Sequence, residues 1–267
     1  MENSEIAWTD NTFNPWVGCT KLSAGCDHCY AENTNKRAGH SNWGAGAERR
    51  VTTDTNWRGP IRWNRKAEAA GTRTKVFCAS MADVFDGEAS ADARKRLWDL
   101  IRITPFLDWQ ILTKRPANFH RFLPKDWGDG YSNVWLGVTA ENREQALRRI
   151  PILQSTPAAI RFVSAEPLLD DLGELNLDGI AWMIIGGESG SKNARPFDVT
   201  WVGRMIDRCK QQRVKVFVKQ LGKKPVCDGS EIVVLNPAGK RDWKGTKPEL
   251  WPKRFKPLAV RQFPAPA

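Results

Sequence analysis

Three cysteines in the first part of the chain have the type and spacing of metal ligands. Cys19, Cys26 and Cys29 form a Cys-x6-Cys-x2-Cys pattern, and the next cysteine is Cys78. A closed structural zinc site has four protein ligands, and an iron–sulfur cube used only for electron transfer is usually held by four thiolates. Three thiolates around a cube leave one iron open to an outside ligand. The pattern therefore predicts a metal site with an open position, and a 4Fe-4S cube held in this way could bind a second molecule.

Composition and sequence context indicate where these cysteines work. The 267-residue chain starts Met-Glu-Asn-Ser-Glu, without the basic start and apolar stretch of a secretory signal. No apolar run approaches the roughly 18 residues of a membrane span. We therefore expect a cytoplasmic protein with no membrane partner. In that reducing compartment, six cysteines are expected to be metal ligands, catalytic groups or buried thiols rather than disulfides.

The charge and the tryptophan content favour a polyanionic partner. The net charge is +11 and the pI is near 9.6, which creates a field that attracts phosphates. Of thirteen tryptophans, Trp57, Trp63 and Trp243 stand beside basic residues. Cations beside aromatic planes are typical of surfaces that bind DNA or RNA by backbone contacts and base stacking. The alternative, that the tryptophans pack in the core and the charge aids solubility, stays open.

Hydrophobic periodicity after residue 71 predicts alternating strands and helices. Helical spacing covers residues 89–104, 142–153 and 200–213, and short apolar runs predict strands at 75–80, 108–113, 134–138, 160–164, 180–185 and 214–218. Strands separated by helices or crossovers indicate βαβ units with a parallel sheet. We predict an α/β fold, a partial or full (β/α) barrel over residues 1–222.

Two regions fall outside this alternation. Residues 33–71 are polar and glycine-rich, and we expect a loop insertion there after a short helix that follows the cysteines. Residues 223–267 lose the periodicity and contain seven prolines, so we expect a Pro-rich C-terminal extension.

Polar residues follow the predicted strands, where a parallel α/β barrel places its chemistry. Ser80 and Asp83 follow one strand, Lys114 follows the next, and Glu166 and Glu188 follow later ones. Together they predict a pocket that grips a zwitterion and a ribose, as S-adenosylmethionine would require. Its amino and carboxylate groups can chelate an open iron, and an electron from the cluster can then break the sulfonium bond to release a carbon radical.

The cysteine pattern, with His28 and Tyr30 beside Cys29, resembles the cluster loop of the radical S-adenosylmethionine superfamily. The whole chain resembles the phage Gp37/Gp68 family, a radical-SAM-like group, over residues 8–222. Five blocks carry this resemblance, at residues 14–19, 25–31, 112–116, 163–169 and 185–190. The first cysteine gap is six residues instead of the superfamily's usual three. The segment Gly186-Gly187-Glu188 comes too late in the chain for its usual role. The second strand instead ends in Ser80 and Asp83 and the next in Lys114, an arrangement that resembles spore photoproduct lyase.

The resemblance implies a role for each candidate residue. The expected cluster ligands are Cys19, Cys26 and Cys29, and the expected cofactor-binding residues are His28, Tyr30, Ser80, Asp83 and Lys114. Glu166 and Glu188 would line the substrate side and hold a donor group or move a proton, unless each forms an ion pair with an arginine. Cys78 would donate a hydrogen atom to a substrate radical if it faces the pocket, and is a core thiol otherwise.

We therefore expect a radical SAM enzyme that generates a 5′-deoxyadenosyl radical and modifies or repairs a nucleic acid or nucleotide, with an electron-donor protein as partner. The alternative is a non-enzymatic nucleic-acid-binding protein in which the same cysteines, with His28 or His40, hold a zinc ion. Spacing argues against it, because His28 lies inside the Cys26-x2-Cys29 knuckle and His40 is far from the loop. The sequence does not select the substrate.

Overall fold

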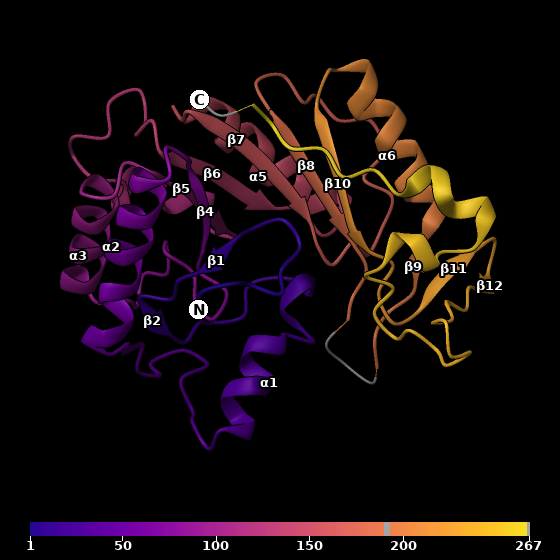
Figure 1. Cartoon of the computed structure of the whole chain (residues 1–267), viewed down its shortest axis with the longest axis horizontal. Coiled ribbons are helices and arrows are strands. Elements are labelled where there is room, and N and C mark those ends of the chain that lie inside the picture. Colours follow the sequence, from indigo (N-terminus) through magenta and orange to yellow (C-terminus); the bar gives the residue numbers. More distant parts are fainter. Residues whose placement is uncertain (190–192, 266–267) are drawn as a thin grey trace.

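A parallel sheet of seven strands forms the centre of the computed structural model in Figure 1, which describes residues 1–189 and 193–265. Neighbouring strands follow the chain order without reversal, and the sheet curls into a half-barrel flanked by helices. The mixed α/β fold is compatible with a partial (β/α) barrel. The strands of the sheet are β1 (Asn11–Thr12), β4 (Thr74–Cys78), β5 (Leu107–Thr113), β6 (Val134–Thr139), β7 (Ile160–Ala165), β8 (Trp182–Gly186) and β10 (Lys215–Gln220).

Three helices follow strands of the sheet and cover its outer face. The side chains of Ser90, Asn142 and Asp198 each accept a hydrogen bond from a backbone N–H of the first helical turn, which fixes where each helix begins. All three helices lie where the sequence predicts them: α3 (Ala91–Arg102), α5 (Arg143–Ser155) and α6 (Val199–Gln211). Within the described ranges, no helix is both long and apolar enough to cross a membrane.

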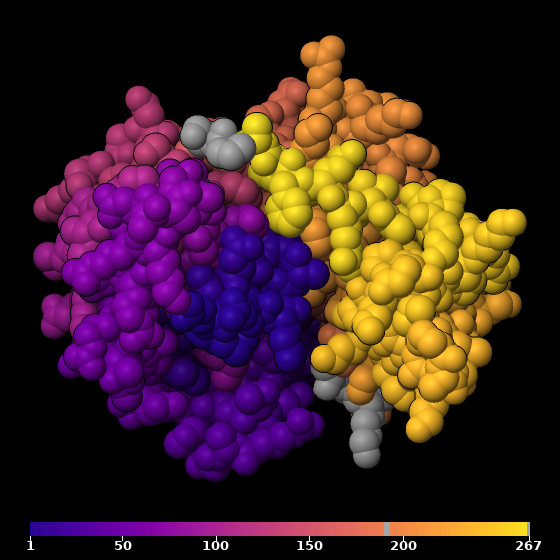
Figure 2. All heavy atoms as spheres, in the orientation of Figure 1, coloured from indigo at the N-terminus to yellow at the C-terminus, as the bar shows by residue number. Residues whose placement is uncertain are grey.

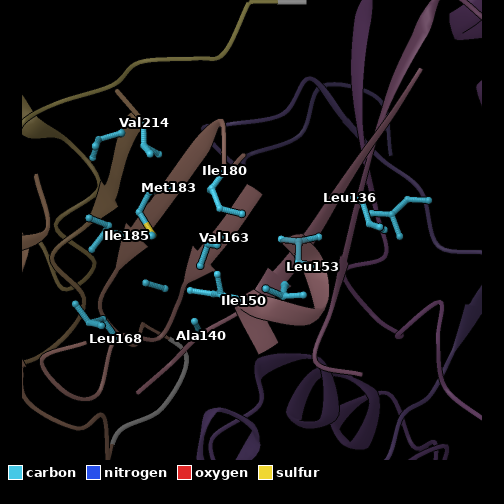
Figure 3. Close-up of a cluster of buried hydrophobic side chains, with 14 of the residues drawn as sticks. Leu136, Ala140, Ile150, Leu153, Val163, Leu168, Ile180, Met183, Ile185 and Val214 are labelled. Carbon is cyan, nitrogen blue, oxygen red and sulfur yellow. The ribbon is translucent and has the colours of Figure 1, made fainter. Parts of the chain in front are cut away.

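The main core lies between the sheet and these helices. Alternate residues of each strand point outward and pack against apolar helix side chains, which is why the strands read as short apolar runs. Figure 3 shows this packing around α5, with Ile150 and Leu153 of the helix against sheet residues that include Leu136, Val163 and Met183.

The predicted loop insertion at residues 33–71 is wrong in part. A short helix, α1 (Tyr30–Arg37), follows the cysteines as expected, but a 16-residue helix, α2 (Asp54–Ala69), lies within the stretch expected to be irregular. The Gly59-Pro60 pair reads as a turn signal and hides the apolar face of α2. Trp57 and Trp63 form that face and are only 3% and 5% exposed, so they are core residues and not part of a nucleic-acid surface.

Aromatic side chains fill the interior of the half-barrel near the amino ends of its strands. We call this group the aromatic plug: the buried Trp8, Phe77, Trp135, Phe162, Trp182 and Phe217, with the exposed Phe263 packed against Trp182 and Phe217. Trp182, Trp135 and Phe162 are the first, second and third residues of their strands, which places most of the plug at that end, whereas Phe77 is the fourth of five residues in β4. The rings meet mainly edge-to-face, as between Trp8 and Trp182 at 6.1 Å, an arrangement that aromatic pairs prefer.

Residues 223–265 pack onto the same core. Ile232, Trp251 and Phe255 belong to the buried cluster between sheet and helices. The backbone at Val260 and Gln262 hydrogen-bonds to Val218 and Val216, so the end of the chain covers the open edge of β10, as Figure 1 shows.

The remaining elements are short. They are β2 (Trp16–Val17), β3 (Arg50–Val51), β9 (Phe197–Asp198), β11 (Pro225–Cys227), β12 (Ser230–Glu231), α4 (Phe119–Phe122) and the 3-10 turns η1 (Ala24–Cys26), η2 (Pro116–Asn118), η3 (Pro248–Leu250) and η4 (Lys253–Leu258). Two small sheets result: β2 pairs with β3, and β11 pairs with both β9 and β12.

Candidate functional site

The cysteine loop, residues 18–29, lies at the carboxyl ends of the strands. It follows β2, and the backbone N–H of Gly18 donates to the carbonyl of Met81, just beyond β4. Cys19, Cys26 and Cys29 are free thiols, and each is partly exposed. The three predicted ligands therefore share one loop at the edge where α/β barrels carry their chemistry.

Arg115, just beyond β5, fastens the start of this loop. Its guanidinium donates to the carbonyl of Thr20 at 2.5 Å and to Asp83 at 3.0 Å, and its Nη1 lies 3.5 Å from the Cys19 sulfur. Asp83 also accepts from the Thr113 hydroxyl at 2.7 Å. Burial, aided by nearby Asp83, raises the pKa of Cys19 to about 12. A metal would therefore have to displace the proton of this thiol, and Asp83 serves here to hold Arg115.

Glu141, just beyond β6, fastens the middle of the loop. Its buried carboxylate accepts from the Ser23 hydroxyl and from the backbone N–H of Gly25 at 3.2 Å. Arg149 of α5 donates to the same carboxylate at 2.8 Å and to the Ser23 hydroxyl at 2.9 Å. Burial alone would raise the pKa of Glu141, but Arg149 and Ser23 outweigh it and lower the pKa below its ordinary value. The carboxylate therefore stays ionised at neutral pH.

Glu188, beyond β8, fastens the end of the loop. It pairs with His28 at 2.9 Å and with Arg195 at 2.8 Å, and Arg195 also donates to the carbonyl of Ala24 at 2.9 Å. Burial would raise the pKa of Glu188, but the hydrogen bonds from Arg195 and His28 lower it overall. Of the two readings of Glu188, the arrangement agrees with the ion pair. His28 is held in the same contact.

The glycines before Glu188 make room for their neighbours. A Cβ atom at Gly186 would lie 2.5 Å from a Glu166 carboxylate oxygen, and one at Gly187 would lie 2.4 Å from the carbonyl oxygen of Leu221. Close packing therefore explains why both positions are glycine. Gly190, the last residue of the block at 185–190, lies outside the described residues.

Beneath the cysteine loop, the interior of the half-barrel is polar. We call these residues the interior polar cluster: Lys114, Thr139, Ser164, Glu166 and Lys219. Lys219 pairs with Glu166 at 3.0 Å, and Lys114 donates to the Thr139 hydroxyl at 3.4 Å. Ser164 and Lys219 each come two residues after a ring of the aromatic plug, so they point to the same interior side. With two ammonium groups and one carboxylate, the cluster favours a carboxylate or phosphate as ligand.

Tyr30 and Ser80 lie between the cysteine loop and β4. The Tyr30 hydroxyl donates to the Ser80 carbonyl at 2.9 Å, and Asn14 donates to the Ser80 hydroxyl at 3.1 Å. Tyr30 is half exposed although it opens α1. Of the predicted cofactor residues, Tyr30, Ser80 and Lys114 lie near the carboxyl ends of the strands, at the mouth of the half-barrel. His28 and Asp83 instead help to hold the cysteine loop.

Cys78 lies on the other side of the sheet. It is fully buried in the core under the helices, whereas its neighbour Phe77 points into the interior. Burial raises the pKa of this thiol. The placement agrees with the core-thiol reading of Cys78 and removes it from the substrate side.

The three thiols are the right chemical type for an iron–sulfur cluster, but they are not arranged around a common metal position. Thiolates are the usual cluster ligands, and Arg115 beside Cys19 would stabilise a thiolate. Yet among the residues that the structure describes, no three His, Cys, Asp or Glu side chains lie close enough to hold a metal ion. Cluster binding would therefore have to draw the three thiols together.

Sequence reasoning missed the residues that fasten the loop. Arg115, Glu141, Arg149 and Arg195 received no role, although each contacts the loop directly. One signal was present: Arg149 falls on the apolar face of a predicted helix, three residues after Ala146. A charge on that face requires a buried partner, which here is Glu141.

The family of the chain can be stated from its sequence match. No curated protein and no solved structure matches the chain. Residues 3–249 match the family described as protein of unknown function (DUF5131), a span that includes the cysteine loop and all seven strands of the half-barrel. The chain therefore belongs to the DUF5131 family.

Proposed function

We propose that this protein is a radical S-adenosylmethionine enzyme that acts on a nucleic acid or nucleotide. Cys19, Cys26 and Cys29 would hold a 4Fe-4S cluster, reduced by an electron-donor protein. The observation that carries the proposal is the placement of the cysteine loop: it is fastened to the ends of β5, β6 and β8, next to the interior polar cluster. When bound, the cluster would supply the electron that cleaves the sulfonium bond of S-adenosylmethionine.

The chain's own residues then have distinct tasks. The Lys114 ammonium and the Ser80 hydroxyl bind the amino-acid part or ribose of the cofactor. Glu166, held by Lys219 at 3.0 Å, accepts a hydrogen bond or a proton from the substrate. Glu188 and His28 keep the cysteine loop over the strand ends. Water is excluded below by the aromatic plug, which strengthens electrostatic interactions at the mouth.

The surplus charge supports a polyanionic substrate. Lysine and arginine outnumber aspartate and glutamate by 41 to 30. The two lysines of the interior polar cluster exceed its single glutamate, so the positive field extends to the site.

The test is an anaerobic reconstitution with iron and sulfide, followed by reduction. Electron paramagnetic resonance is recorded with and without S-adenosylmethionine, and 5′-deoxyadenosine is measured in the same sample. We expect a cubane signal that changes when the cofactor is added, together with deoxyadenosine. Both should be lost in Cys26→Ala and retained in Cys227→Ala, which removes a thiol from β11, outside the cysteine loop.

Metal analysis of the purified protein gives the opposing outcome. One tightly bound zinc ion, no uptake of iron and no cofactor cleavage would exclude the radical enzyme and favour the zinc-stabilised binding protein. His28 already contacts Glu188, so a zinc site would have to break that pair or use another fourth ligand.

A further inference from the structure

One tryptophan beside basic residues is not part of the core. Trp57 and Trp63 are buried in the α2 face, but Trp243 is 57% exposed. The Arg241 guanidinium lies over its ring at 4.2 Å, a cation–π contact. The exposed Trp243 ring contributes little to the fold, and it is therefore available to a binding partner.

Trp243 belongs to a hairpin, which we call the C-terminal hairpin, residues 232–245. Its two arms meet at an antiparallel bridge between Leu235 and Arg241, and a backbone hydrogen bond joins Asp242 to Val234. The turn between the arms is capped by the Asn236 side chain, which accepts from the backbone of Lys240 at 3.0 Å.

The hairpin has one buried face and one exposed face. Ile232 and Val234 are 3% and 2% exposed and pack on the core. Val233 and Leu235, which alternate with them, are 47% and 50% exposed. Because side chains alternate along an extended arm, the outward face of this arm carries these two apolar residues. Trp243, on the other arm, is exposed as well.

Positive charge is concentrated in this part of the chain. Residues 223–267 contain ten lysines and arginines and four acidic residues, so a sixth of the chain carries +6 of its +11 net charge. Lys240 and Lys244 flank Trp243 on the hairpin, and both are exposed. Charge complementarity therefore favours a polyanion over an apolar protein surface as the occupant.

The hairpin stands next to the candidate site. Its second arm hydrogen-bonds to the chain just after β10, where the N–H of Gly222 donates to the carbonyl of Lys244 at 3.0 Å. The next residue, Lys223, donates to the carbonyl of Glu188 at 2.8 Å, and Glu188 holds His28 of the cysteine loop. Figure 2 shows the yellow and orange C-terminal part beside the indigo and violet N-terminal part on this view of the molecule.

We propose that the C-terminal hairpin binds single-stranded nucleic acid, with Trp243 stacking on an unpaired base and Lys240 and Lys244 contacting phosphates. Stacking on an exposed ring requires a base that is not paired, which selects a single strand over a duplex. The inference rests on the proposed function for the class of substrate, but it needs neither the cluster nor the cofactor.

Fluorescence anisotropy with a labelled oligothymidylate of about ten nucleotides tests the inference on the purified, iron-free protein. Trp243→Ala should weaken binding about tenfold, and Trp243→Phe should retain most of the affinity because the ring can still stack. Lys244→Ala should lower the slope of log affinity against log salt by about 0.7, the value for one phosphate contact on a single strand. Lys95→Ala is the matched control, because it removes one exposed positive charge from α3.

Several outcomes would overturn the inference. They are equal affinity of wild type and Trp243→Ala, tighter binding to a duplex of the same length, or an effect of Lys95→Ala as large as that of Lys244→Ala. If no oligonucleotide binds and light scattering shows a dimer that Trp243→Ala abolishes, the face is a protein contact and the inference is wrong. Cluster assembly is measured separately, so its failure would leave this result standing.

Discussion

At the amino ends of the strands, the half-barrel interior is filled by aromatic rings, whereas at the carboxyl ends it is lined by charged and hydroxyl groups. Trp182 and Phe162 are fully buried at the first end and meet other rings on several sides. Glu141 is just as buried at the second end, but its contacts are Arg149, Ser23 and a backbone N–H.

The difference separates two ways of holding a structure together. Apolar packing is nearly independent of pH and salt, and it tolerates little movement. Charged hydrogen bonds depend on protonation, and most of their contribution to stability is lost if a single partner is removed. The aromatic end therefore fixes the sheet, and the charged end holds a loop whose contacts depend on the protonation of its partners.

The largest expected effect comes from the aromatic end. Trp182→Ala should lower the free energy of unfolding by about 4 kcal/mol, because it leaves a cavity among five neighbouring rings. Urea unfolding measures the loss. Hydrogen exchange in residues 23–27 should stay close to wild type once the lower global stability is accounted for. Faster exchange confined to that segment would show that the two ends are not independent.

A smaller loss is expected at the charged end. Glu141→Gln should cost about 3 kcal/mol, because Arg149 keeps a buried charge without its counterion. Hydrogen exchange in residues 23–27 should rise by more than the global loss explains. Asp99→Asn is the control, since it weakens an exposed ion pair with Arg102 on α3 and should cost less than about 1 kcal/mol. Equal losses in the two variants would contradict the role given to Glu141.

The smallest effect is the pH dependence. The pKa of Glu141 is lower in the folded chain than in the unfolded chain, so its contribution is full above the unfolded value, about 4.3, and is lost as the pH falls through the folded value. The stability difference between wild type and Glu141→Gln should therefore shrink as the pH falls below about 4.3. The difference between wild type and Trp182→Ala should stay constant. Unfolding by urea at a series of pH values checks both.

Most of the sheet could be predicted from the sequence, since its longer strands are short apolar runs bounded by turn signals. The two-residue strand β1 could not, because Asn11 and Thr12 have no apolar pattern and pair with β4 only through the backbone. Helix α2 was missed because Gly59-Pro60 outweighed the spacing of its tryptophans. In both places tertiary contacts override the local signal.

The candidate site was predicted in position but not in its pairings. The strand-end residues do gather at one edge, yet which of them face the interior depends on strand register. Lys114 and Glu166 point inward, whereas Asp83 forms an ion pair with Arg115. The partner of a buried charge comes from a distant part of the chain, and a single sequence does not reveal it.

The fastening of the cysteine loop also sets an order of events in folding. Its contacts join residues far apart in sequence: Arg115 reaches back 95 positions to Thr20, Glu141 reaches 116 to Gly25, and Arg195 reaches 171 to Ala24. Contacts of such long separation form late, because a large loop of chain must close first. The loop is therefore synthesised before each of these three residues, and it is among the last segments to settle. Until Arg195 has been made, the carbonyl of Ala24 lacks its donor, and the segment that carries the three thiols is incompletely docked.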